Sequence, residues 1–177
     1  MCGIAYGCEY DETTITLQGI GVLYKYWRYG IGSRLLEFFE TKVDRIKITV
    51  GTASDESVEQ FYLKNGYKPV QFLIRIKFNQ LPFDYEQKKA NFKVINEKYD
   101  QENEAIILFI ETLEYDNKLK NNIKTEFHSY ETIYIMEKGI QSNISCDINQ
   151  FFLSKTDDVC PSVVKQKNTY PNLKIRR

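Results

Sequence analysis

The chain has 177 residues, of which 42% are hydrophobic and 27% charged, and its 24 basic and 24 acidic side chains give a formal net charge of zero. The length is that of about one domain, and the composition is typical of a globular rather than a disordered protein. Zero net charge argues against a sequence-independent nucleic-acid binder, because such binding depends on an excess of basic residues. The sequence contains neither a signal peptide nor an apolar run of membrane-spanning length. We therefore expect a cytoplasmic protein that binds neither nucleic acid nor membrane.

Hydrophobic periodicity predicts an α/β (α+β) order of elements in the first part of the chain. Alternation predicts strands over 4–10, 13–22, 45–50 and 71–78, and helical spacing predicts helices over 30–43 and 57–65. Asp55 favours the start of the second helix and Gly66 its end. Three residues are expected on the buried face of this helix: Val58, Phe61 and Tyr62.

Glycine divides the chain, since eight of its nine glycines lie in residues 1–66. Glycine allows a backbone to approach a ligand closely, so the first part is the candidate for function. We predict a functional core over 1–79 and a C-terminal extension over 80–177, with a loose tail from about residue 155. In the extension we expect a polar, partly helical stretch over 85–99, followed by a β-α-β-like unit. Its elements are a strand in 104–113, a helix over 117–127 with Leu119 and Ile123 inward, and a strand over 132–136.

Cysteine and histidine give no sign of a metal centre. The spacings of Cys2, Cys8, Cys146 and Cys160 match no zinc motif, and free thiols are the favoured state. The single histidine, His128, lies in a polar stretch that indicates a surface position rather than a catalytic base. We expect no metal.

The stretch from Val22 to Leu36 leads from the end of a strand, through a turn, into a helix. The first N–H groups of a helix have no partner within it, and the helix dipole adds partial positive charge there. Gly30 and Gly32 remove the Cβ atoms that would keep an anion away, so the turn is a candidate site for a phosphate-sized anion. The stretch completes neither a P-loop nor a dinucleotide-binding fingerprint, and the glycines could also serve only close helix–sheet packing.

A second informative stretch, residues 53–70, follows one strand later. The two stretches together indicate a function more specifically than the first does alone. Both stretches together resemble the two signatures of the GNAT superfamily of acyl-CoA-dependent N-acetyltransferases, in order and in separation. The matching residues are Gly30, Gly32, Leu35 and Leu36 in the first and Tyr62, Gly66 and Tyr67 in the second. The resemblance covers about residues 3–78. It implies a mixed twisted sheet with helices on both faces, lacking the usual N-terminal strand, two helices and second strand.

The resemblance implies a site for acetyl-CoA, used as co-substrate, and for an amine acceptor that is a small molecule or a protein. The end of the strand would hold the pantetheine arm, and a backbone N–H near Leu23 would polarise the thioester carbonyl. Tyr62 would be the general acid for the departing thiolate, with a core aromatic as the alternative. The implied cofactor-binding residues are Val22, Leu23, Tyr24, Arg28, Tyr29, Gly30, Ile31, Gly32, Ser33, Arg34 and Asp55.

The chain also departs from the family pattern. Trp27 stands where Gln or Arg is usual, and Asp55 stands where Asn is usual, so Asp55 either adds negative charge beside the cofactor or caps its helix. No general base is identified, since Glu9, Asp11 and Glu12 are better explained as solvated turn residues.

Three explanations fit the missing family elements. The chain is shortened, or residues 80–177 replace the elements, or two copies complete each other as a homodimer across an open sheet edge. Replacement by the C-terminal part is favoured. The sequence thus predicts an N-acetyltransferase in which a primary amine attacks acetyl-CoA directly; the alternative is a catalytically inactive GNAT-fold module that binds CoA or another protein.

Overall fold

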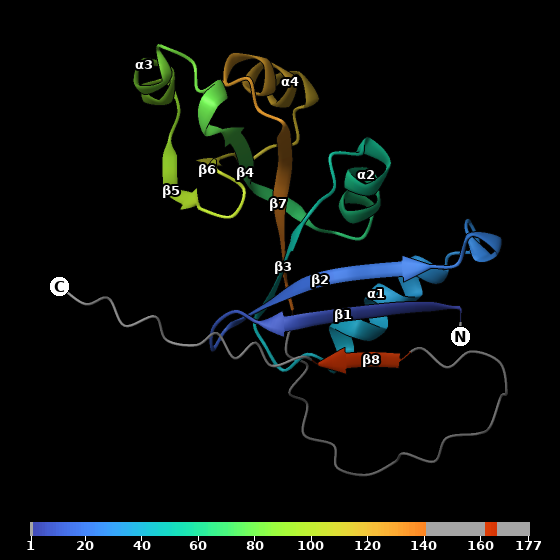
Figure 1. The fold of residues 1–177 in the computed structure, drawn as a ribbon. Coiled ribbons are helices and arrows are strands. Elements are labelled where there is room, and N and C mark those ends of the chain that lie inside the picture. The colour runs from blue at the N-terminus through green and yellow to red at the C-terminus, as the bar shows by residue number, and fades with distance from the viewer. Residues whose placement is uncertain (1, 141–161, 166–177) are drawn as a thin grey trace, which may run out of the picture. The chain divides into compact units, whose positions relative to one another are not determined.

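Figure 1 shows the fold in a computed structural model, which describes residues 2–140 and 162–165. The described residues form two compact units, one of residues 2–48, 139–140 and 162–165 and the other of residues 49–138. The units divide at residues 48/49 and 138/139, whereas the glycine distribution predicts a boundary at residues 79/80. The predicted loose tail and two of the cysteines, Cys146 and Cys160, fall outside the described residues, except that a short strand is described at 162–165.

The first unit is built on a β-hairpin. Strands β1 (Gly3–Glu9) and β2 (Thr14–Val22) pair antiparallel, and the Asp11 carboxylate closes their turn by accepting the N–H groups of Thr13 and Thr14, each at 2.8 Å. Strand β8 (Ser162–Lys165) runs parallel to β1 along its other edge. The 3-10 turn η1 (Tyr24–Tyr26) follows β2 and leads to helix α1 (Ile31–Lys42).

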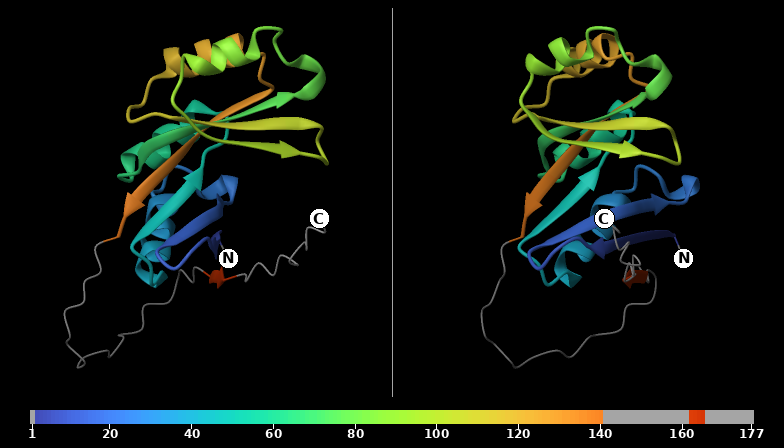
Figure 2. Two further views of the ribbon diagram at one scale, coloured as in Figure 1. Left: turned by 90° about the vertical axis from the view of Figure 1, so that its left-hand side faces the viewer. Right: turned by 60° about the vertical axis from the view of Figure 1, so that its left-hand side comes forward.

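Helix α1 lies along one face of this hairpin, as the two views of Figure 2 show. Its apolar side chains Leu35, Leu36 and Phe39 are buried, as the helical spacing predicts. The residues of β1 beneath them are small. A Cβ atom at Gly7 would lie 2.9 Å from Cζ of Phe39, so the helix could not approach a larger residue here without a shift. Glycine at this position therefore allows α1 to pack closely on the hairpin.

The second unit is centred on strand β4 (Lys68–Lys77). β4 pairs antiparallel with β6 (Ala105–Glu111) on one side and with β7 (Glu131–Gly139) on the other. β6 and β7 are therefore parallel, and helix α4 (Asn117–Glu126) connects them, which confirms the predicted β-α-β unit. Strand β3 (Lys47–Gly51), which contains the boundary between the units, is the neighbour of β7. Parallel and antiparallel pairing together confirm the α/β class with a mixed sheet.

Helices complete the second unit. α2 (Glu56–Lys64) precedes β4, and the short turn η2 (Phe78–Gln80) follows it. Helix α3 (Tyr85–Ala90) lies with α4 on the same side of the sheet (Figure 2). The ring of Phe127 packs there against those of Tyr85 and Phe92, with centroid distances of 6.0 and 5.7 Å.

Three details differ from the sequence-based expectations. The stretch 85–99 contains, besides α3, the edge strand β5 (Val94–Asp100), whose residues are mostly exposed and therefore show no apolar alternation. On α2 the buried residues are Glu59 and Tyr62, whereas Val58 and Phe61 are only half-buried. On α4, Ile123 is buried as expected, but Lys120 rather than Leu119 accompanies it. In both helices a charged residue is buried at a position that the predicted apolar face does not include.

The pairing of β4 predicts that residues 1–79 do not fold as an independent domain. A chain ended at residue 79 loses β6 and β7, both neighbours of β4, and exposes the apolar side chains of that strand. We expect this fragment to lack the cooperative thermal transition of the full chain in far-UV circular dichroism. A chain ended at Ile140, which loses only β8 among the described strands, is the control and should keep the transition. Cooperative unfolding of the 1–79 fragment would contradict the expectation.

Candidate functional site

In the first unit, the turn between β2 and α1 has the geometry of an anion site. Arg28 and Gly30 both adopt left-handed backbone conformations, with φ of +65° and +73°. Gly30 precedes the first residue of α1, and its carbonyl accepts the N–H of Arg34 at 3.1 Å. The N–H groups of Ile31, Gly32 and Ser33 therefore belong to the first turn, where no carbonyl of the helix can accept them.

The space at Gly30 is open. A Cβ atom added there would meet no other atom within 4 Å, and no acidic residue lies in the first turn of α1. Residues 13–36 contain three cationic side chains, Lys25, Arg28 and Arg34, and no Asp or Glu. The partial charge at the helix start and the full charges in this segment are thus all positive, which favours the binding of an anion.

The end of β2 is less open than the sequence suggests. β2 ends at Val22, and the next residues form η1 instead of an extended strand. The carbonyl of Val22 accepts the indole N–H of Trp27 at 2.6 Å, that of Leu23 accepts the N–H of Tyr26 at 2.8 Å, and that of Tyr24 accepts the N–H of Trp27 at 3.0 Å. The N–H of Leu23 donates to the carbonyl of Cys2 at 2.9 Å. Each of the expected pantetheine acceptors therefore already takes part in a hydrogen bond.

In the second unit, Tyr62 lies on α2 in an aromatic cluster. Tyr62 is 4% exposed. Its ring packs edge-to-face against those of Phe61 and Tyr67, with centroid distances of 5.2 and 5.5 Å. Burial raises the pKa of the Tyr62 phenol to about 12. The phenol is thus protonated at neutral pH, as a proton donor must be, although its proton is held more tightly than that of an exposed tyrosine.

Asp55 caps α2. Its carboxylate accepts the N–H of Ser57 at 2.7 Å, and the hydroxyl and the N–H of Ser57 hold the pKa of Asp55 below its usual range. This is the capping role that the sequence left open beside a role at the cofactor. The N–H of Asn65 then donates to carbonyls of Phe61 and Tyr62 where the helix ends, ahead of Gly66.

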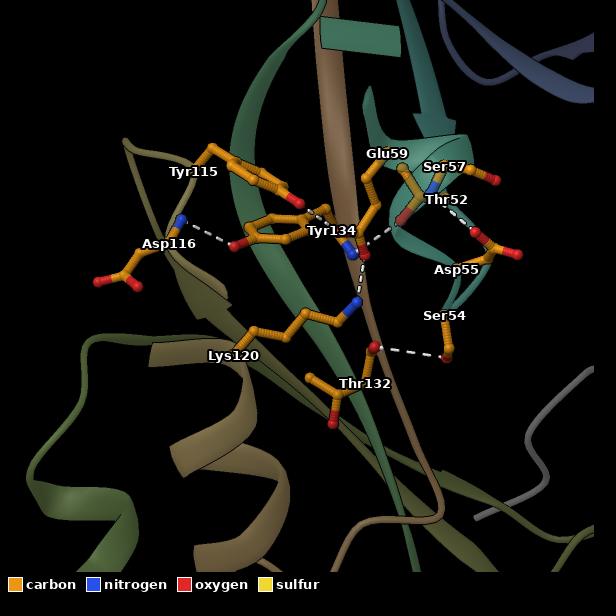
Figure 3. Close-up of polar contacts among 10 residues, drawn as sticks. All are labelled: Thr52, Ser54, Asp55, Ser57, Glu59, Tyr115, Asp116, Lys120, Thr132 and Tyr134. Atoms are coloured by element: carbon orange, nitrogen blue, oxygen red, sulfur yellow. Dashed lines mark hydrogen bonds and ion pairs between the residues drawn. The ribbon is translucent and has the colours of Figure 1, made fainter. Parts of the chain in front are cut away.

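A buried polar cluster joins α2 to α4 and to the residues just before α4, as Figure 3 shows. Glu59 is fully buried and pairs with the ammonium group of Lys120, which is itself buried. The hydroxyl of Tyr115 donates to the second carboxylate oxygen of Glu59 at 2.9 Å. Lys120 also lies over the ring of Tyr134, 5.7 Å from its centroid. Both carboxylate oxygens of Glu59 thus have a partner, the Lys120 cation on one and a hydroxyl donor on the other.

Two backbone contacts extend this cluster. The hydroxyl of Tyr134 accepts the N–H of Asp116 at 2.9 Å, and the N–H of Tyr134 donates to the hydroxyl of Thr52 at 3.1 Å. Burial raises the pKa of both Tyr134 and Tyr115, so these phenols stay protonated at neutral pH. No pattern in the sequence indicates the cluster, because Glu59 and Lys120 are 61 residues apart.

The remaining candidates lie at the surface. Asp11 and Glu12 are exposed in the hairpin turn, and Glu9 forms an ion pair with Arg45 at 3.0 Å. His128 is exposed after α4, as expected. Cys2 and Cys8 are free thiols. Among the residues that the structure describes, no group of His, Cys, Asp and Glu side chains is arranged to hold a metal ion.

The comparison with protein families agrees with this geometry. Residues 1–69 match the family model described as the acetyltransferase (GNAT) domain, which confirms the resemblance over this part of the chain. The matched segment contains the turn before α1 and the whole of α2, so both signature stretches lie within the part of the chain that is similar to this domain. No curated protein and no solved structure matches the chain. None of the described helices has the length and apolar character needed to cross a membrane.

The Glu59–Lys120 pair predicts strongly non-additive effects on stability. Glu59→Leu leaves the buried Lys120 ammonium without its counter-charge, and we expect it to lower the free energy of unfolding by about 3–5 kcal/mol. Lys120→Met should cost a similar amount, because it leaves a buried carboxylate. The double variant Glu59→Leu/Lys120→Met removes both charges and should recover most of the loss. Urea denaturation of all four proteins gives the coupling energy, and additive losses would contradict the importance of the pair.

Proposed function

We propose that the protein is an acyltransferase that transfers an acetyl group from acetyl-CoA to a primary amine. The observation that carries the proposal is the coincidence of the family match over residues 1–69 with an open, acid-free turn at the start of α1. A pyrophosphate fits such a turn, because a helix start offers unpaired N–H groups and a favourable dipole. The acceptor is a small-molecule or a protein amine.

The cofactor would be held by the first unit. In this proposal the N–H groups from Arg28 to Ser33 bind the pyrophosphate, and the cationic side chains of Arg28 and Arg34 add attraction to it. The end of β2 at Val22, Leu23 and Tyr24 binds the pantetheine arm. Asp55 caps α2 by accepting the N–H of Ser57, which gives its carboxylate a structural role but leaves its negative charge in place. Residues 1–79 thus carry the proposed cofactor contacts, and residues 80–138 complete the fold around α2 and β4.

The proposed reaction needs three proton movements: the amine nitrogen loses two protons and the sulfur gains one. The amine nitrogen attacks the thioester carbonyl, a C–N bond forms, the C–S bond breaks, and the sulfur leaves as a thiolate that must gain a proton. The amine is charged in solution at neutral pH, with a pKa near 10.4 for a lysine-like group, so it must lose one proton before the attack and another after it. Tyr62 is the proposed donor to the thiolate, since its phenol is protonated.

A second candidate function is a non-catalytic module that binds CoA or a protein through the same fold. Two observations favour it: the carbonyls at the end of β2 already accept hydrogen bonds, and the pKa of Tyr62 is well above that of a thiol, which makes the phenol a reluctant acid. Release of free thiol from acetyl-CoA over a panel of amines distinguishes the two. Binding of acetyl-CoA in calorimetry without any thiol release would favour the non-catalytic module.

Charge at Gly30 tests the proposed phosphate site. Asn and Asp both tolerate the left-handed backbone and have the same shape, so Gly30→Asn and Gly30→Asp differ only in charge. We expect Gly30→Asp to bind acetyl-CoA at least about tenfold more weakly than Gly30→Asn, through repulsion of the pyrophosphate. Isothermal titration calorimetry measures both, with Gly139→Asp as the control for the added charge. Equal affinity of the two Gly30 variants would place the phosphates elsewhere, and no binding to the wild-type protein at millimolar acetyl-CoA would overturn the proposed function.

Removal of the Tyr62 hydroxyl tests the proposed acid. Tyr62→Phe keeps the aromatic cluster but cannot donate a proton, and we expect kcat to fall by a factor of about 100 or more, the usual contribution of a general acid. The KM for acetyl-CoA should change by less than about threefold, because the hydroxyl acts in the transition state. Tyr67→Phe, which removes the hydroxyl of the neighbouring ring, is the matched control and should keep its activity. Undiminished turnover of Tyr62→Phe would show that the phenol is not the acid.

A further inference from the structure

Trp27 is the only tryptophan of the chain, and it lies at the surface, where its side chain makes a hydrogen bond and a ring contact. Its side chain is 57% exposed, yet its indole N–H donates to the carbonyl of Val22 at 2.6 Å, and its ring contacts that of Tyr24 at 5.1 Å. An exposed tryptophan would be mobile without such contacts. The hydrogen bond therefore holds the ring at the end of β2, where the backbone of the strand would otherwise be free to accept a ligand.

The bonds that close this end of β2 differ in kind. Those of the Leu23 and Tyr24 carbonyls come from backbone N–H groups of the turn, so breaking them requires the turn to change its conformation. The bond to the Val22 carbonyl comes from a side chain, and rotation of the Trp27 side chain breaks it while the backbone stays in place. Of the acceptors in this segment, the Val22 carbonyl is thus the one released at the lowest cost.

We infer that Trp27 is a latch that occupies the ligand-binding end of β2 in the free protein and is displaced by the pantetheine arm of an acyl-CoA. The pantetheine arm carries two amide N–H groups, which need carbonyl acceptors when they leave water. An extended chain that pairs with the end of β2 takes over the Val22 carbonyl from the indole and releases the ring. The inference rests on the proposed function, and it adds a competition between a side chain of this protein and its substrate.

This competition has a measurable cost. Binding must break the indole–carbonyl hydrogen bond, and a hydrogen bond of this kind contributes a net amount to stability that corresponds to about a 2- to 10-fold change in an equilibrium constant. Trp27→Phe keeps an aromatic ring beside Tyr24 but has no N–H to donate. We expect this variant to bind acetyl-CoA 2- to 10-fold more tightly than the wild-type protein.

The control variant is Tyr26→Phe, which removes one hydroxyl from the same turn and keeps its ring beside Lys25. Its affinity should equal that of the wild-type protein. Calorimetry with acetyl-CoA on the three proteins gives the comparison. A Trp27→Phe variant that binds as the wild type does, or more weakly, overturns the latch while it leaves the proposed function intact. If none of the three proteins binds acetyl-CoA, both the latch and the proposed function fail.

Fluorescence of the sole tryptophan supplies a second measurement on the unmodified chain. CoA and 4′-phosphopantetheine, which contain the arm, should shift the emission of Trp27 to longer wavelength, because the ring moves into water. Adenosine 3′,5′-bisphosphate, which lacks the arm, should leave the emission unchanged. An equal change with adenosine 3′,5′-bisphosphate would mean that the purine stacks on Trp27, and an unchanged emission in saturating CoA would mean that the ring does not move; either result overturns the latch.

Discussion

The carboxylate of Glu59 is fully buried in the second unit, and its position depends on a lysine that follows it by 61 residues. An isolated charge in a protein interior costs several kcal/mol, so α2 can bury Glu59 only when Lys120 and Tyr115 come with it. This requirement ties helix α2 to the segment 105–138. The family match ends at residue 69, at the start of β4, but both partners of Glu59 and both neighbours of β4 come from later residues. The later segment is therefore part of the same folding unit as α2.

The first unit depends on a different constraint, the close approach of helix α1 to a strand of small residues. Gly7 leaves no room for a Cβ atom between the carbonyl of Thr16 and the ring of Phe39, so a larger residue here would force the hairpin or the ring to shift. The start of the helix is then joined to β2 by a turn with two left-handed residues, Arg28 and Gly30. A non-glycine residue in that conformation is uncommon and costs about 1–2 kcal/mol, so the packing of α1 must supply the free energy that holds Arg28 there.

Much of this architecture can be predicted from local patterns, and the exceptions have physical reasons. The hairpin, α1, α2 and the β-α-β unit follow from hydrophobic spacing, because each has one face in the core. Strand β5 has no such face: its residues 95–99 are exposed, and its position depends on pairing with β6. The burial of Glu59 and Lys120 escapes prediction because both side chains are charged, and spacing places only apolar side chains in the core. What makes these positions acceptable is a partner far away in the sequence.

The candidate site also has one part that the sequence predicts and one part that it does not. The turn at Gly30 can be recognised from two glycines and a change of period, since its chemistry belongs to the backbone. The closed end of β2 cannot be recognised, because the donor is a side chain whose rotamer no sequence pattern fixes. The sequence shows only that Trp27 replaces the usual residue, whereas the structure shows that its N–H reaches the carbonyl of Val22.

The buried cluster around Glu59 and Lys120 also supports the helix that carries Tyr62. Glu59 precedes Tyr62 by three residues, so the two side chains are neighbours on the surface of α2, one turn apart. The ion pair with Lys120 fixes one point of the helix, and the contacts of the Tyr62 ring with Phe61 and Tyr67 fix the next. A phenol that must meet a leaving group gains from a rigid support, since a misplacement of about 1 Å can cost a factor of about 100 in rate. Part of that support comes from α4, which lies outside the matched family segment, so the segment after β4 serves the proposed chemistry by holding the helix that carries Tyr62.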